Sequence, residues 1–267
     1  MTEIARQEAL EKLRGAVEAA QRRTQVAFDY GFVKSNVDSE APPLARLVQG
    51  GRGGEVRLKL YLTITMMATR DPFDLRRSRT PQAWARLLAL PQPTEQGARR
   101  ISASLSWLET ADLVKLTPRK GSTPAIQLLH PVHEKRPYTR PISHYVGVPI
   151  DFWLNGWIVD LSATGIALLM VLIDNGRGEK DKARYVTTLR RSEYGLSHGT
   201  WTRATKELNC YGLVKVDRDL FGDDFDSARL RNTYQLNLAR LETQATPEER
   251  AAAAAALVRP KPKGNPV

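Results

Sequence analysis

The sequence contains a single cysteine, Cys210, in 267 residues. One cysteine cannot form a disulfide within the chain, so a disulfide-stabilised secreted fold is excluded and a reducing compartment is favoured. Because Cys210 falls late in a predicted helix, we expect it to be a small buried hydrophobic group rather than a redox sensor.

Long apolar segments are also missing. The longest run, 166–173, is far shorter than the roughly 20 residues that a membrane-spanning helix needs. The N-terminus lacks the apolar region of a signal peptide. We therefore expect a cytoplasmic protein with no membrane partner.

The motifs that carry enzyme chemistry are absent as well. The glycine-rich stretch 50–54 is not followed by the Gly-Lys-Ser/Thr of a phosphate loop. His130, His133 and His144 lack a cysteine or a suitably spaced acidic residue to complete a metal site. No nucleophile elbow or Ser-His-Asp spacing is readable. The sequence thus predicts no catalytic residue, cofactor or metal, and a protein that is not an enzyme.

Positive charge, by contrast, is in excess. Forty Lys and Arg against twenty-nine Asp and Glu leave a net charge of +11. A hydrophobic content of 42% with 26% charged residues is typical of a globular protein. The charge favours a polyanionic partner, nucleic acid or an acidic membrane surface, and a basic but inert surface is the alternative.

The chain is organised around the stretch 94–129. Residues 94–112 are predicted to form a helix, because Ile101, Leu105 and Leu108 recur at helical spacing and line one side. Polar donors lie largely off that side: Arg99, Arg100, Ser102 and Ser106.

A β-hairpin is predicted directly after this helix. Apolar strands at 113–116 and 125–129 flank a turn that carries Arg119 and Lys120, and Gly121 is free to take a positive φ. A helix with outward donors beside a basic hairpin fits a DNA groove and its flanking phosphates.

The same pattern returns one hundred residues later. Leu-x4-Leu-Val-Lys begins at Leu108 and again at Leu208, and Trp201 and Thr205 take the places of Ile101 and Leu105. Tyr194-Gly-Leu-Ser197 reads as a helix end, a turn and a cap. With these residues the sequence resembles the winged-helix superfamily of helix-turn-helix proteins.

The resemblance implies a mainly α fold with small β-hairpin wings (α+β), built as two tandem winged-helix domains plus an N-terminal helix. Further helices are expected at 56–69, from the Thr80-Pro81 start to Pro91, from the cap Ser162 to about 173, and at 186–194. The expected division follows the chain: 1–54, N-terminal helix and Gly/Pro-rich loop; 55–130, first winged helix; 131–149, Pro-rich basic linker; 150–241, second winged helix; 242–267, Ala-rich helix and basic disordered tail.

The resemblance also implies double-stranded DNA as the partner, with recognition helices in the major groove and a basic wing on the backbone. In the first copy the contact residues are those of the helix and hairpin tip: Arg99, Arg100, Ser102, Ser106, Arg119 and Lys120. In the second copy the candidates are His198, Thr200, Thr202, Arg203, Lys206, Arg229 and Arg231. Lys135, Arg136 and Arg140 of the linker are expected to follow the phosphate backbone between the domains.

The second wing departs from the first because it is acidic. Five carboxylates occur between 216 and 229: Asp217, Asp219, Asp223, Asp224 and Asp226. They would repel a phosphate backbone, so this tip is expected to point away from DNA or to contact a protein.

Two features near the N-terminus complete the expectations. The predicted helix 2–28 carries an apolar stripe of Leu10, Leu13, Val17 and Ala20, either docked on the first domain or forming a homodimer seam. The stretch 39–54 contains Pro42-Pro43 and five residues rich in glycine, and is expected to be a loop.

The expected fold is compatible with three kinds of biological role. Tandem winged helices resemble those of plasmid replication initiators, and single ones those of transcriptional regulators. The sequence favours a transcriptional regulator that binds DNA sequence-specifically, with a plasmid or phage replication initiator as the alternative. A hypothesis of another class is a protein-binding adaptor of a chromosome-organisation complex.

Overall fold

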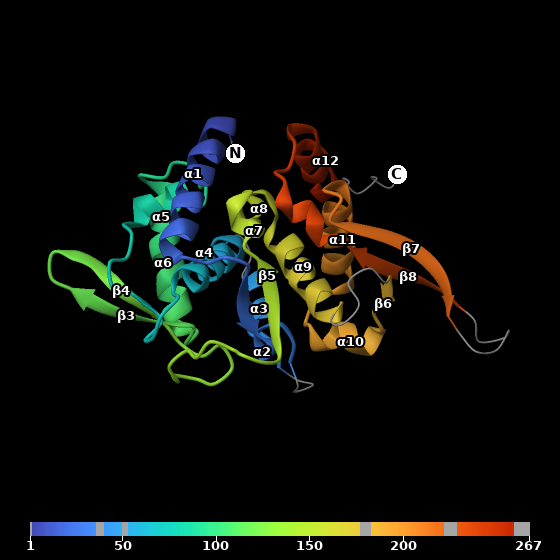
Figure 1. Ribbon diagram of the computed structural model, residues 1–267, viewed down its shortest axis with the longest axis horizontal. Helices are drawn as coiled ribbons and strands as arrows, with labels where there is room; N and C mark the ends of the chain where they lie inside the picture. The colour runs from blue at the N-terminus through green and yellow to red at the C-terminus, as the bar shows by residue number, and fades with distance from the viewer. Residues whose placement is uncertain (1, 36–39, 50–52, 177–182, 222–228, 259–267) are drawn as a thin grey trace, which may run out of the picture.

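The computed structural model describes residues 2–35, 40–49, 53–176, 183–221 and 229–258, with side chains left out at 188–190. Its coarse class is as predicted, helices combined with small antiparallel sheets. Helix α9 (Ala163–Asn175) lies near the centre, and two hairpins extend from opposite ends of the longest axis (Figure 1).

One order of elements occurs twice, in what we call the first and second units. The first unit consists of α4 (Gly54–Met67), β2 (Asp74–Leu75), α5 (Pro81–Leu87), α6 (Gln96–Thr110), β3 (Val114–Arg119) and β4 (Ser122–Leu128). The second consists of α9, β6 (Arg184–Tyr185), α10 (Thr188–Glu193), α11 (His198–Cys210), β7 (Val214–Phe221) and β8 (Arg229–Leu236). Their antiparallel sheets have matching strand orders, β2-β4-β3 and β6-β8-β7.

The correspondence extends to single hydrogen bonds. Each third helix ends in a bond of 2.9 Å from a leucine N–H to the leucine carbonyl five positions earlier: Leu113 to Leu108, and Leu213 to Leu208. The preceding residue has a left-handed backbone in both units, with φ of 53° at Asp112 and 66° at Gly212. The repeat that the sequence predicts is therefore present in the backbone.

The helix starts follow from local chemistry. Thr80, Ser162 and Ser197 each accept a hydrogen bond from the backbone N–H three residues on, at 3.2, 3.0 and 3.2 Å. The sequence predicts these caps, and it also predicts α4. The Ala-rich helix α12 (Pro247–Leu257) begins with a capping box between Thr246 and Glu249.

The N-terminal segment differs from the prediction. Helix α1 (Glu3–Ala20) ends at Gln21, which has φ of 53°, and Gln25–Asp29 forms strand β1 instead of continuing the helix to 28. Strand β1 pairs antiparallel with β5 (Tyr145–Pro149). Within the predicted Pro-rich linker at 131–149, the last five residues are fixed in a sheet by a partner about 120 positions away.

The apolar stripe of α1 lies inside the molecule. Leu10, Leu13, Val17 and Ala20 are all buried, and α1 contacts α4 and α5 of the first unit. It also contacts α7 (Asp151–Leu154), which precedes the second unit. The predicted docking of α1 on the first unit is confirmed. The alternative, that this stripe forms a homodimer seam, is wrong because other side chains of the same chain already cover it.

The stretch 39–54, predicted to be a loop, contains helix α3 (Pro43–Gln49). Proline is tolerated in the first turn of a helix, and Leu44 and Leu47 bury the inner side of α3. Three short helices lie in connecting segments: α2 (Tyr30–Val33), α8 (Trp157–Asp160) and the 3-10 helix η2 (Leu238–Glu242). Trp153 and Trp157 are fully buried and belong to the core.

The two units share one hydrophobic core. Helix α9 contacts α11 of its own unit, and it also contacts α3, α4 and β5. A polar link joins α4 to α8, which precedes the second unit, because the buried Lys59 of α4 donates a hydrogen bond of 3.1 Å to the carbonyl of Val159. The units are therefore packed against each other, not tethered by a free chain.

A buried ion pair joins α1 to α8. The Arg6 guanidinium donates to both carboxylate oxygens of Asp160, at 2.9 Å from Nε and 2.7 Å from Nη2, and the two side chains are only 3% and 0% exposed. The remaining Nη1 donates to the Gln244 side chain at 3.1 Å. Both ends of the described chain thus meet at this pair.

We expect Arg6→Met to lower the free energy of unfolding by about 3–5 kcal/mol, because it leaves the Asp160 carboxylate buried without its partner. Urea titration followed by circular dichroism measures this. The control is Lys12→Met, which breaks a partly exposed ion pair with Glu8 at 3.5 Å, one turn away on α1, worth about 0.3–0.5 kcal/mol. Equal midpoints for the two variants would contradict the role given to the pair.

Candidate nucleic-acid interface

Helix α6 has the two sides that the sequence predicts. Ile101 and Leu108 are fully buried and Leu105 is 7% exposed, so three apolar side chains anchor the helix on the core. Burying each of them stabilises the fold by roughly 1.5–3 kcal/mol. The predicted contact residues are all exposed: Arg99, Arg100, Ser102 and Ser106.

The β3–β4 hairpin stands beside α6 in the same unit. Its tip carries the exposed Arg119 and Lys120, and Gly121 has the expected positive φ, 68°. The Arg119 guanidinium donates to the carbonyl of Arg76, and Thr123 Oγ1 donates to the carbonyl of Ser78 at 2.6 Å. The hairpin is thus fixed to the segment before α5, while the charge of Arg119 is not neutralised by this neutral acceptor.

That segment supplies basic residues that the sequence reasoning missed. Arg76 and Arg77 are exposed, and Arg79 is half-buried with its Nε lacking a hydrogen-bond partner among the described residues. Burial lowers the pKa of Arg79. With Lys12 and Arg86 it lines a hollow between α1 and α5. A signal is present in the sequence, since Arg76-Arg77-Ser78-Arg79 directly precedes the cap Thr80.

Helix α11 repeats the amphipathic arrangement with fewer fully exposed groups. Trp201 and Leu208 are buried, and Thr205 is half-buried. Its predicted contact residues divide by exposure: His198, Thr202 and Lys206 are exposed, while Thr200 and Arg203 are half-buried. Thr200 and Arg203 bond to the start of the helix. Thr200 Oγ1 accepts a hydrogen bond from the hydroxyl of Ser197, and Arg203 Nε donates one to the Gly199 carbonyl.

The second hairpin differs from the first in chemistry. Arg229 is exposed, whereas the guanidinium of Arg231 stacks 5.4 Å from the centre of the Tyr185 ring. Asp217 pairs with Lys215 at 2.9 Å, and Asp219 accepts a hydrogen bond from Thr233 at 2.8 Å. The other predicted acidic residues, Asp223, Asp224 and Asp226, lie outside the described residues. Exposed apolar side chains share the hairpin: Leu220, Phe221 and Leu230.

The elements that carry the two sets of predicted contact residues lie in opposite halves of the molecule, α6 with β3 and β4 in one half and α11 with β7 and β8 in the other (Figure 1). Within each half the helix and its hairpin lie together, because they belong to one sheet-and-helix unit. Helices α6 and α11 each have one exposed side, and the shared core fixes the distance between the two helices.

A buried carboxylate locks α11 onto α9. Glu207 accepts hydrogen bonds from the backbone N–H and the hydroxyl of Ser162, the N-cap of α9, the first of them at 2.6 Å. The carboxylate lies so close to Gly165 that a Cβ there would meet it at 2.6 Å, which explains the glycine. Burial raises the pKa of Glu207, although the two hydrogen bonds from Ser162 act in the opposite direction.

No protein-family model, no curated protein and no solved structure matches this chain. Among the helices of the described segments, none combines the length and the apolar character that crossing a membrane requires.

The raised pKa of Glu207 predicts a pH dependence. The folded protein holds this proton more tightly than the unfolded chain, so the contribution of Glu207 to stability falls as pH rises from 4.5 through the raised pKa. Glu207→Gln removes the titration. We therefore expect the stability of the wild type relative to Glu207→Gln to fall as the pH rises above 4.5, measured by urea titration. A difference that is constant or that grows with pH would contradict the buried setting of this carboxylate.

Proposed function

We propose that the protein binds double-stranded DNA sequence-specifically through two tandem winged-helix units. The observation that carries the proposal is the twofold occurrence of one arrangement: a helix anchored by buried apolar residues, exposed polar side chains on its outer side, and an adjoining hairpin. The net charge of +11 supports a polyanionic partner.

In this proposal α6 enters the major groove, whose width admits a helix. Arg99 and Arg100 contact base edges or phosphates, and Ser102 and Ser106 add weaker contacts. Arg119 and Lys120 hold the backbone beside the groove.

The second unit makes a smaller contribution to DNA contact. His198, Thr202 and Lys206 are the exposed candidates of α11, and Arg229 is the exposed one of β8. The shared core of the two units fixes their separation, so one chain reads two half-sites at a set spacing without dimerising.

Regulation of transcription is the process we favour, and initiation of plasmid or phage replication is the second candidate. The tandem repeat within one chain supports initiation, because the sequence resembles the paired winged helices of such initiators. An adaptor function is supported by the second hairpin alone, where exposed Leu220 and Leu230 face each other across the strands beside acidic residues.

Arg99→Ala/Arg100→Ala is expected to weaken binding to a specific duplex by about 1–3 kcal/mol for each arginine that reads a base. The site is first obtained by selecting bound fragments from a random duplex library, and affinity is then measured by fluorescence anisotropy. Arg14→Ala/Arg46→Ala, which removes two exposed arginines from α1 and α3, is the matched control. Wild-type affinity in the Arg99/Arg100 variant would mean that α6 does not read the DNA.

Lys120→Ala is expected to weaken binding to all duplexes alike, because a phosphate contact carries no sequence information. The slope of log affinity against log salt should become shallower by roughly one unit. Anisotropy titrations at several salt concentrations, with Arg46→Ala alongside, measure both effects. An unchanged slope would place the hairpin tip away from the backbone.

A further inference from the structure

Four arginines from three distant segments meet at one hollow, which we call the arginine hollow. Arg22 and Arg23 follow the end of α1, Arg70 follows α4, and Arg140 precedes β5. Gln25 of β1 also lines it. Like charges repel, so gathering them needs a compensating gain.

Arg22 is held rigidly at the edge of this hollow. Its guanidinium donates to the carbonyls of Met66, Thr65 and Ala68 at 3.1, 3.1 and 3.3 Å, where the last turn of α4 leaves acceptors unpaired. Burial, and then the neighbouring charge of Arg140, lower the pKa of Arg22.

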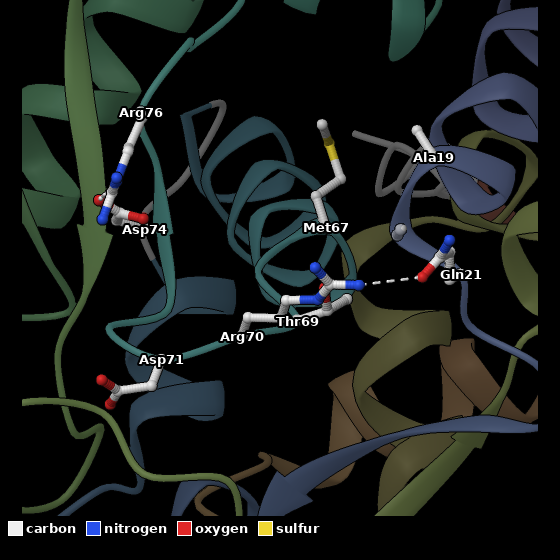
Figure 2. A pocket seen from close by; sticks show the side chains of 9 residues that line it. Ala19, Gln21, Met67, Thr69, Arg70, Asp71, Asp74 and Arg76 are labelled. Atoms are coloured by element: carbon white, nitrogen blue, oxygen red, sulfur yellow. Dashed lines mark hydrogen bonds and ion pairs between the residues drawn. The ribbon is translucent and has the colours of Figure 1, made fainter.

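The guanidinium groups of Arg70 and Arg140 are also oriented by neutral partners. Arg70 donates to the Gln21 side chain at 3.2 Å, a bond that Figure 2 marks with a dashed line. Arg140 donates to the carbonyl of Thr69 and lies 5.9 Å from the centre of the Phe73 ring. These acceptors fix geometry without cancelling charge.

Carboxylates do not neutralise the arginine hollow. In the described part of the chain, no ion pair within 4.0 Å joins Arg22, Arg23, Arg70 or Arg140 to an acid. Asp71 is next in sequence, but Figure 2 shows its carboxylate directed away from the Arg70 guanidinium. The adjacent Asp74 pairs instead with Arg76, at 3.3 Å.

We propose that the arginine hollow binds a phosphate group, and that this phosphate belongs to the backbone of the duplex read by the first unit. The assignment to DNA rests on the proposed function. Continuity supports it, because Arg70 and Arg76 line one neighbouring hollow together with Asp71 and Asp74, and the carbonyl of Arg76 accepts the hydrogen bond from Arg119 of the hairpin. Guanidinium groups therefore lead from the hairpin tip to the arginine hollow. Such groups recognise phosphate oxygens with paired donors.

The test uses the full chain and Arg23→Gln/Arg70→Gln, which removes two exposed charges and spares Arg22 at the end of α4. We expect the salt dependence of duplex binding to become shallower by about 0.9 units of slope, because the phosphate held in the arginine hollow is no longer neutralised. Arg23→Lys/Arg70→Lys, which keeps the charge, should retain most of the slope. Arg14→Gln/Arg46→Gln removes the same charge elsewhere and should leave the slope as in the wild type. An unchanged slope in a folded Arg23→Gln/Arg70→Gln protein would overturn the assignment to DNA.

A second arm separates this proposal from the function on which it rests. Tripolyphosphate, added without DNA, should raise the melting temperature of the wild type more than that of Arg23→Gln/Arg70→Gln. If the wild type bound no duplex at all, the proposed function would fail. The tripolyphosphate measurement would then show whether the arginine hollow binds phosphate. A response abolished in the variant would support a phosphate site for a free ligand, and equal responses would overturn the site altogether.

Discussion

Burial of α9 against the first unit and the elements before it is the constraint on which the rest of the structure depends. This helix is the first of the second unit, yet it also packs against α3, α4 and β5, and nearly all of its side chains are buried. A helix that is apolar on all sides is stable only when other elements surround it. The separation and mutual orientation of α6 and α11 therefore follow from how α9 is enclosed.

The local part of this fold is readable from the sequence. Ile101, Leu105 and Leu108 at helical spacing, the caps Thr80 and Ser197, and Gly121 in the turn each depend on neighbours within a few positions. The exposed side of α6 follows from the same periodicity. These signals are strong because helix and hairpin geometry is determined by adjacent residues.

The non-local part is not readable in this way. Strand β1 has only two buried apolar residues, Val26 and Phe28. It becomes a strand because it pairs with β5, which follows the whole first unit in the sequence. The gathering of Arg22, Arg70 and Arg140 likewise depends on tertiary packing, since nothing in their spacing relates them. Individual positions on α11 are also unpredictable, because Arg203 bonds to its own helix start instead of projecting outward.

The pairing of β1 with β5 has a consequence for how the chain is made. Gln25 is aligned with Pro149, so the first half of the molecule contains a strand whose partner is synthesised more than a hundred residues later. A ribosome adds roughly 5–20 residues per second, so the N-terminal strand waits several seconds for its mate. Contacts that close such long loops form slowly, and α1 also needs α7, from beyond the same point, to complete its packing. The sheet and the packing of the N-terminal segment are therefore completed only after residues 145–154 have been synthesised.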